Sequence, residues 1–228
     1  MKMKLNLFND DDILFHYTSN EIALKYILKD KKIRFTPFGQ LKDPRESKKW
    51  SFDILNARPE DHKKMQEDVN SVFNDFIKTK CKILCLCSNS NEEINIEENA
   101  IPHYRIAYYT AGFTKSRMWM QYAANHTGVC LAFSREALNS ELKASYGNYK
   151  KYSDAVEYQY HLAAFVKAKK IDSRHLVKSC SKDIVKDYID KYHHEYFFLK
   201  LKDFERENEY RFVLVGESDE YIYLRLNT

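Results

Sequence analysis

The sequence predicts an α+β fold with a mixed, mainly antiparallel sheet and flanking helices. Short strand-like runs interleave irregularly with longer runs of helical periodicity, and two further strand-like runs close the chain. Of the 228 residues, 44% are hydrophobic and 31% are charged, a mixture typical of a globular protein with its own core. We therefore expect a single domain over residues 1–228.

The first half of the chain predicts three strands and two helices. Thr18 is expected to cap the first helix, with Glu21 completing a capping box. Residues 40–58 look irregular. Cys81, Cys85 and Cys87 alternate along an apolar run, which favours a central strand buried on both faces. The expected strands cover 13–17, 32–36 and 81–87, and the second helix covers 60–79.

The second half is expected to begin with an insertion or mobile loop over 89–114, because that stretch starts acidic and rich in Asn. A helical, highly charged segment is expected over 159–200. The two last runs, 210–215 and 221–226, predict a hairpin that turns over 216–219. The other expected elements are a helix over 115–125, a strand over 129–133, a helix from Ser134 and a strand over 152–158.

Composition excludes several classes of protein. With only 5 Gly and no glycine-rich phosphate motif, the chain lacks both the Rossmann fingerprint and the P-loop. Five Cys without a C-x-x-C pair predict reduced thiols and no zinc site, which suits the cytoplasm. No apolar run reaches the roughly 18 residues of a membrane span, so we expect no membrane partner. A net charge of +4 is compatible with an acidic ligand without requiring one.

Two early blocks carry polar side chains at expected element ends. His16, Tyr17 and Thr18 precede a helix N-terminus, where unpaired N–H groups attract anions, so they could hold ribose hydroxyls or phosphate. A half-buried His beside a helix cap is the simpler interpretation. Arg45, within Asp43-Pro44-Arg45-Glu46, could hold a pyrophosphate through its planar fork, although a turn with an internal ion pair also explains that block.

Later blocks add an aromatic ring and two carboxylates. Tyr122 shares a helix face with Trp119 and could stack on a flat ligand, although such a stripe is more often core. Ser88 ends the Cys-rich strand and is expected to face the same cleft. Glu207, Glu209 and Arg211 alternate, so they are solvent-facing, paired with one another or placed in a cleft. Two adjacent carboxylates would separate in pKa, which suits acid–base roles.

Taken together, the blocks resemble the bacterial domain of unknown function 2971 family. The resemblance spans residues 13–215. It departs from the family pattern at Cys87, where an aromatic is more usual, at Lys42, where Asn is usual, and between Ser88 and Met118, where the segment looks longer than in typical relatives. The segments that carry it are Phe15-His16-Tyr17-Thr18, Asp43-Pro44-Arg45-Glu46, Cys85-Leu86-Cys87-Ser88, Met118-Trp119-Met120-Gln121-Tyr122-Ala123 with Gly128, and Glu207-Asn208-Glu209-Tyr210-Arg211.

More distantly, the order of the blocks resembles ADP-ribosyltransferases, whose fold carries an early His or Arg, a middle Ser or Tyr, and a late Glu. The resemblance implies that His16 binds ribose and that Tyr122 stacks on nicotinamide. It further implies that Glu209 holds the nicotinamide ribose and stabilises an oxocarbenium-like transition state, while Glu207 orients the acceptor. Residues implied in NAD binding are His16, Tyr17, Thr18, Arg45, Ser88, Tyr122 and Arg211.

The resulting hypothesis is an NAD-dependent ADP-ribosyltransferase that modifies a protein or nucleic acid, as a toxin or phage-defence effector does. The sequence leaves two alternatives open. One is an inert relative that binds a nucleotide or a partner protein as a sensor. The other is a metal-dependent nucleic-acid-processing protein, because two nearby carboxylates are natural Mg²⁺ ligands.

Overall fold

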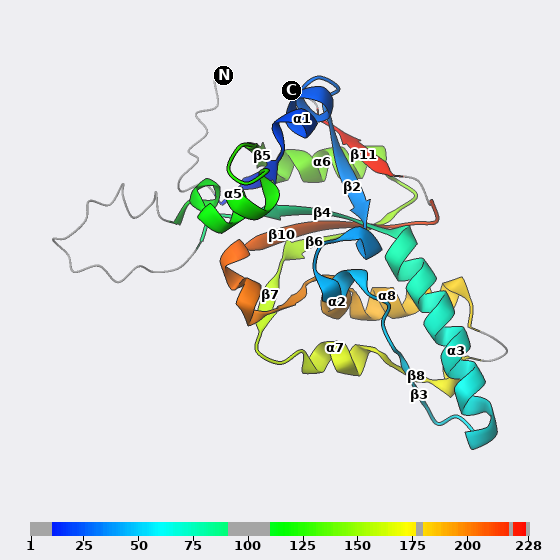
Figure 1. The fold of residues 1–228 in the computed structure, drawn as a ribbon. Coiled ribbons are helices and arrows are strands. Elements are labelled where there is room, and N and C mark those ends of the chain that lie inside the picture. The colour runs from blue at the N-terminus through cyan, green and yellow to red at the C-terminus, as the bar shows by residue number, and fades with distance from the viewer. Residues whose placement is uncertain (1–10, 91–109, 177–179, 219–220, 227–228) are drawn as a thin grey trace.

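The computed structural model describes residues 11–90, 110–176, 180–218 and 221–226 (Figure 1). Within them, the predicted α+β class is confirmed: a curled antiparallel sheet is flanked by helices. Two small parallel sheets, β3–β8 and β7–β9, lie outside the main one. The main sheet comprises β1 (Ile13–Thr18), β2 (Lys32–Pro37), β4 (Cys81–Cys87), β5 (Val129–Ser134), β6 (Lys150–Ala155), β10 (Glu209–Val215) and β11 (Ile222–Arg225), and the small sheets comprise β3 (Asp53–Leu55), β7 (Glu157–Gln159), β8 (Lys170–Asp172) and β9 (Leu199–Leu201).

The sheet splits along one edge of its central strand, β4. On one side β10 pairs with the whole of β4, from Glu209 opposite Cys87 to Val215 opposite Cys81. On the other side β2 pairs only with residues 82–83, and β1 pairs only at Cys87. No strand of the described chain therefore pairs with residues 84–86 on that side, and β1 and β2 diverge around them.

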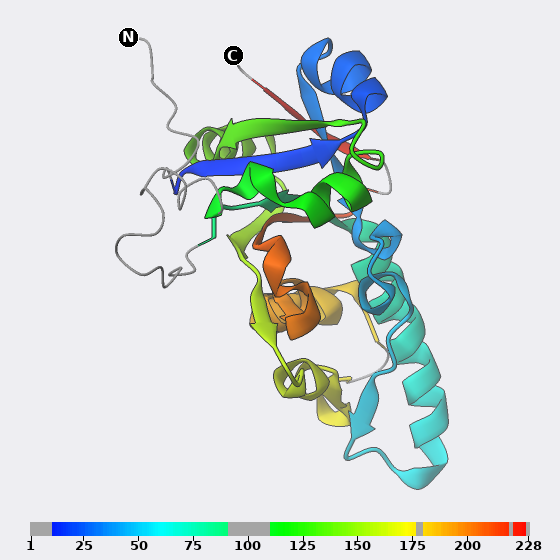
Figure 2. The same ribbon diagram turned by 60° about the vertical axis from the view of Figure 1, so that its left-hand side comes forward.

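The helices lie on both faces of the sheet (Figures 1 and 2). Two of them continue in π-helical geometry, α1 through Ala23–Leu28 and α3 through Phe76–Lys80. The α-helices are α1 (Asn20–Ile22), α2 (Pro44–Ser47), α3 (Pro59–Asp75), α5 (Ser116–Tyr122), α6 (Arg135–Ser145), α7 (Ala163–Ala168) and α8 (Lys182–Phe197), and the 3₁₀ helices are Phe38–Gln40, Gly112–Thr114, Ser173–His175 and Lys202–Glu207.

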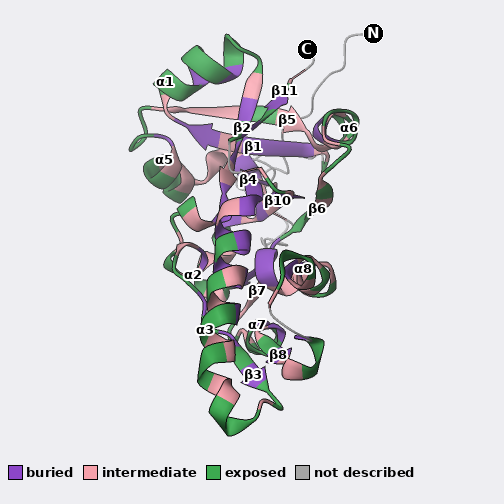
Figure 3. Ribbon diagram, turned by 90° about the vertical axis from the view of Figure 1, so that its right-hand side faces the viewer, coloured by how far each residue is buried: buried purple, intermediate pink, exposed green. Residues whose placement is uncertain are grey.

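Three apolar clusters form the core (Figure 3). Alternation along β4 sends Cys81 and Ile83 into a cluster with α3, α7 and α8, and sends Leu84 and Leu86 into a second cluster with α6 and β11. The third cluster packs α5 against β1 and contains Cys87. The first and third clusters both lie on the Cys81–Cys87 face of the sheet, and Cys85, between these two residues, is half-buried and packs against the first cluster. The prediction of 81–87 as a buried central strand is confirmed.

The predicted C-terminal hairpin is wrong. Both strands exist, but β10 has its two edges occupied by β4 and β6, so β11 pairs with β2 instead. The segment expected to be helical over 159–200 is helical only in part. Ile171 is buried in β8, which pairs with β3, and this strand separates α7 from α8.

Two local predictions are also corrected. The first helix is capped by Ser19, whose hydroxyl accepts from the Ile22 N–H, because Thr18 is buried in β1 opposite Val129. Residues 40–58 are not irregular throughout, since they contain α2 and β3. Most of the expected insertion over 89–114 lies outside the described residues. The helices that the structure describes include none with the length and apolarity needed to cross a membrane.

Candidate functional site

A cavity of about 290 Å³ lies where β1 and β2 diverge from β4. Segments distant in sequence contribute to it: the two diverging strands, the loop before α2, α5, β9, and the start of β10. Apolar side chains line one part and charged side chains another. The lining residues are Phe15, His16, Tyr17, Arg34, Thr36, Gln40, Leu41, Lys42, Asp43, Glu46, Ile83, Leu84, Cys85, Leu86, Cys87, Met118, Tyr122, Lys200, Glu207, Glu209 and Arg211.

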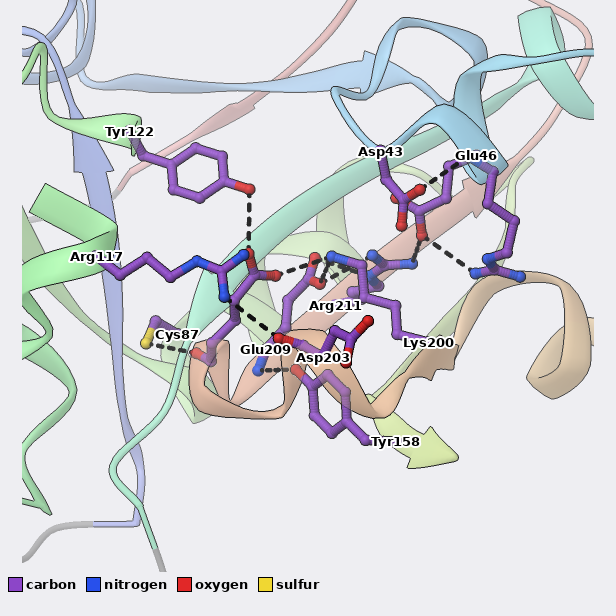
Figure 4. Close-up of polar contacts among 12 residues, drawn as sticks. Asp43, Glu46, Cys87, Arg117, Tyr122, Tyr158, Lys200, Asp203, Glu209 and Arg211 are labelled. Carbon is purple, nitrogen blue, oxygen red and sulfur yellow. Dashed lines mark hydrogen bonds and ion pairs between the residues drawn. The ribbon is translucent and has the colours of Figure 1, made fainter. Parts of the chain in front are cut away.

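Arg211 is the centre of a buried ion-pair network beside this cavity (Figure 4). Its side chain is fully buried and donates from Nε and Nη2 to the two carboxylate oxygens of Glu209, at 2.8 and 2.9 Å. Its Nη1 donates to the Phe197 carbonyl and lies 2.6 Å from Oε1 of Glu46. This guanidinium therefore fixes Glu209 in a bidentate pair and joins β10 to α2.

Lys200 joins the two carboxylates of the late block. Its Nζ lies 2.9 Å from Oε2 of Glu207 and 2.9 Å from Oε2 of Glu209. The other oxygen of Glu207, Oε1, accepts from the Tyr122 hydroxyl at 3.4 Å, a long hydrogen bond. Figure 4 shows this hydroxyl directed from α5 toward the ion pairs. Glu207 thus retains more acceptor capacity than Glu209.

Opposite charges keep Glu209, Lys200 and Arg211 ionised at neutral pH. Burial alone would raise the pKa of Glu209, but Arg211 and Lys200 lower it to about 2. Burial also opposes the charge of the two cations, yet Glu209 raises the pKa of each above its ordinary range. The site therefore presents fixed charges in a region that little water enters.

His16 lies where β1 leaves β4. Burial lowers the pKa of its imidazole from 6.5 to about 4, while a hydrogen bond with the Cys85 backbone acts in the opposite direction. The ring is therefore neutral at pH 7. With one nitrogen engaged by the backbone, the other keeps a lone pair that can accept from a ligand hydroxyl.

Close packing at Gly128 holds the end of α5 against β1. The Gly128 N–H donates to the Ala123 carbonyl at 2.8 Å. A Cβ at Gly128 would lie 2.2 Å from the Thr18 carbonyl oxygen and 2.8 Å from that of Ala123. Because both neighbours are backbone atoms, glycine is needed for the approach that brings Tyr122 to the cavity. A second anchor is the edge-on contact between the rings of Tyr17 and Trp119, 5.3 Å apart.

The cavity brings together six of the residues that the sequence singled out. His16 and Tyr17 come from β1, Tyr122 from α5, and three more from the late block: Glu207, Glu209 and Arg211. Tyr17 donates its hydroxyl to the Gly112 carbonyl at 2.5 Å, so its ring, rather than its polar end, is available to a ligand.

Three predicted ligand-binding residues lie outside the cavity. Thr18 is buried in the β1–β5 pair. Arg45 donates to the Leu199 carbonyl and stacks on Phe165, with its Cζ 5.0 Å from the ring centre, because α2 directs it toward α7. Ser88 donates to the Asn208 carbonyl at 3.0 Å and lines a separate cavity of about 330 Å³, since the strand ends before it.

Several charged lining residues did not emerge from the sequence as site residues, among them Arg34, Lys42, Glu46 and Lys200. Lys200 sits between two leucines in a three-residue strand, and Glu46 follows the more conspicuous Arg45. Arg34 occupies the exposed face of β2, and Lys42 an irregular loop. None belongs to a motif with a chemical spacing. Two of them carried a signal in the sequence: Glu46 belongs to the Asp43-Pro44-Arg45-Glu46 block, and Lys42 stands where the resembled family usually has Asn.

The acidic side chains of the cavity are not arranged as a metal site. In the described ranges, no group of three or more His, Cys, Asp and Glu side chains is arranged to hold a metal ion. Both Glu207 and Glu209 contact the ammonium group of Lys200, which neutralises them where a cation would otherwise lie.

Comparison with known proteins gives one match. Residues 118–212 match the model of a family described as protein of unknown function (DUF2971), which supports the resemblance drawn from the sequence. The match starts at the first residue of the Met118-Trp119 block and includes the late Glu-x-Glu-Tyr-Arg block. No curated protein and no solved structure matched the chain.

Proposed function

We propose that the cavity at the split in the sheet binds NAD, and that the protein transfers ADP-ribose from NAD to a protein or nucleic-acid acceptor. One observation carries the proposal: His16, Tyr122, Glu207 and Glu209, which are distant in sequence, line one cavity. An early strand His, a middle Tyr and a late Glu in one cleft are the residues that an ADP-ribosyltransferase-like fold would require. The volume of about 290 Å³ lies near the lower limit for small-molecule sites, so it suits the nicotinamide–ribose half of NAD.

In the reaction, the bond between ribose C1′ and the nicotinamide nitrogen breaks, and its electron pair leaves with nicotinamide. Positive charge develops on C1′ and the ring oxygen, and a fixed carboxylate nearby stabilises it. The acceptor nucleophile then bonds to C1′ and releases its proton to solvent. Neutral His16 would accept a hydrogen bond from a ribose hydroxyl, and Tyr122 would contact the nicotinamide ring.

We assign the charge-stabilising role to Glu207 rather than to Glu209. Both oxygens of Glu209 are held by Arg211, and one also contacts Lys200. Oε1 of Glu207 has only the 3.4 Å hydrogen bond from Tyr122. A ligand can displace that long contact more easily than a bidentate ion pair. Glu209 then acts by holding Lys200 and Arg211 in position.

The test is nicotinamide release from NAD by the purified protein, measured by chromatography. Glu207→Gln should lower the rate about 100-fold, the effect of removing one preorganised group that stabilises transition-state charge. Glu205→Gln is the matched control, because Glu205 lies on the same 3₁₀ helix, pairs with Lys202 and is absent from the cavity lining. Equal rates for the two variants would contradict the role of Glu207.

A second candidate, an inert NAD-binding sensor, is favoured by the closed pairing of Glu209 with Arg211 and Lys200. In that case wild type would bind NAD without releasing nicotinamide. If the protein neither binds NAD nor releases nicotinamide at millimolar NAD, both candidates are rejected.

A further inference from the structure

We propose that Arg34 and Lys42 form a phosphate-binding rim that holds the pyrophosphate of the dinucleotide outside the cavity. The inference rests on the proposed NAD site and names the part of the ligand that the cavity is too small to enclose. It replaces Arg45, which the structure directs away from the cavity.

Paired and unpaired charges lie in different parts of the cavity lining. Eight ionisable residues with charged forms at neutral pH line the cavity, besides neutral His16 and Tyr and Cys side chains: four acidic and four basic. Two of the bases, Lys200 and Arg211, form ion pairs with Glu46, Glu207 and Glu209. The fourth acid, Asp43, caps α2 by accepting from the Arg45 backbone N–H at 2.8 Å. Within the described chain, Arg34 and Lys42 have no carboxylate partner, so the rim presents two positive charges, although the eight charges of the lining balance as a whole.

The side chain of Arg34 is already oriented by an aromatic ring. Its Cζ lies 4.8 Å from the centre of the Tyr221 ring, and the Tyr221 hydroxyl donates to Oε1 of Gln40 at 3.0 Å. Stacking engages the face of the guanidinium and leaves its N–H edges for an acceptor. No hydrogen bond or ion pair in the described part of the chain engages those edges. A planar fork of this kind matches two phosphate oxygens.

Lys42 connects the rim to the ring of Tyr122. Its Nζ lies 5.0 Å from the centre of that ring and donates to the Gln121 carbonyl at 3.0 Å. A phosphate beside Lys42 would therefore belong to the same ligand as a nicotinamide on Tyr122. Two cations at the mouth of a cavity that holds an uncharged sugar and ring select a dinucleotide over a nucleoside.

The experiment compares NAD, ADP-ribose and nicotinamide riboside by titration calorimetry with wild type and the Arg34→Ala/Lys42→Ala double variant. The double variant should bind NAD and ADP-ribose at least about tenfold more weakly. Each charge-assisted hydrogen bond to phosphate raises the affinity of a complex by roughly tenfold or more, and the variant lacks these bonds. Its affinity for nicotinamide riboside, which has no phosphate, should change by less than about twofold.

The matched control is Lys29→Ala/Arg225→Ala, which removes the same charge from two exposed residues absent from the cavity lining. It should bind all three ligands as wild type does. If wild type binds NAD and the rim variant binds it equally well, the rim is wrong and the NAD site stands. Equal loss of NAD and nicotinamide riboside would also reject the rim, because the substitutions would then act through the fold. If wild type binds none of the three ligands, the proposed function itself fails.

Discussion

The two halves of β10 are equally buried and chemically opposite. Val213 and Val215 pack into the apolar cluster under the sheet, whereas Glu209 and Arg211, on the same face of the same strand, face the cavity. The apolar half needs only close packing. The charged half needs Lys200 from β9 and Glu46 from α2 to neutralise it. A buried ion pair adds little to stability over apolar packing, so stability does not explain the charged half, and we infer that its charges serve the cavity.

Removing the central charge of the network should have the largest effect on stability. Arg211→Met should destabilise the protein by about 3–5 kcal/mol, because it leaves Glu209 and Glu46 buried without their main partner. Val213→Ala should cost about 2 kcal/mol, the effect of a small cavity. Urea unfolding measures both.

The double variant Glu209→Leu/Arg211→Met sharpens the same test. It should be more stable than Arg211→Met alone, since Lys200 keeps Glu207 as its partner and Glu46 keeps Arg45. If the double variant is less stable than Arg211→Met, the unpaired charge of Glu209 is not the cause of the instability of the single variant.

His16 should make the stability of the protein depend on pH. Burial lowers the pKa of His16 from 6.5 to about 4, so the unfolded chain binds more protons than the folded one between these values. Stability should therefore be full above pH 6.5 and fall by up to about 3 kcal/mol as the pH drops to 4. His16→Gln, measured by urea unfolding at each pH, should lose this component, and an unchanged pH profile in the variant would contradict the burial of the ring.

A smaller effect is expected where α5 meets β1. Gly128→Ala should destabilise by about 1–3 kcal/mol, because its Cβ would clash with two backbone carbonyls. Gly147→Ala is the control, since nothing lies within 4 Å of a Cβ there. Thermal unfolding of the two variants should differ clearly, and equal midpoints would show that α5 can shift without strain.

The smallest effect concerns the link between α5 and the charged half. Tyr122→Phe removes only the 3.4 Å hydrogen bond to Glu207, so it should cost about 0.5–1.5 kcal/mol or less. Calorimetric unfolding measures it. A loss comparable to that of Arg211→Met would place Tyr122 among the structural members of the network.

The sequence predicted those strands and helices whose apolar residues recur with the period of the element and so mark its buried face. The alternating cysteines of β4 and two leucines of α6 are examples. Cys81, Cys87, Leu138 and Leu142 are buried, and Cys85 is half-buried. The sequence did not predict which strands pair. Nothing in residues 210–226 records that β6 occupies the edge of β10 that a hairpin would use.

The site was predictable only in part, for a similar reason. His16 and Glu209 stood out because their neighbours form short blocks of reactive residues. Lys200 did not, because its role depends on β9 pairing with β7 and delivering its ammonium group to the start of β10. Arg45 and Ser88 were misplaced because a local turn or strand end, and not the residue type, sets the direction of each side chain.

The most direct test of the central claim is thermal stability of the purified protein with and without NAD, in wild type, His16→Ala and Glu207→Gln. NAD at about 100 times its dissociation constant should add roughly 2.7 kcal/mol to the stability of wild type. The account predicts this shift in wild type, its loss in His16→Ala and a reduced shift in Glu207→Gln. No shift in wild type at millimolar NAD, or an equal shift in all three proteins, would contradict an NAD site at the split in the sheet.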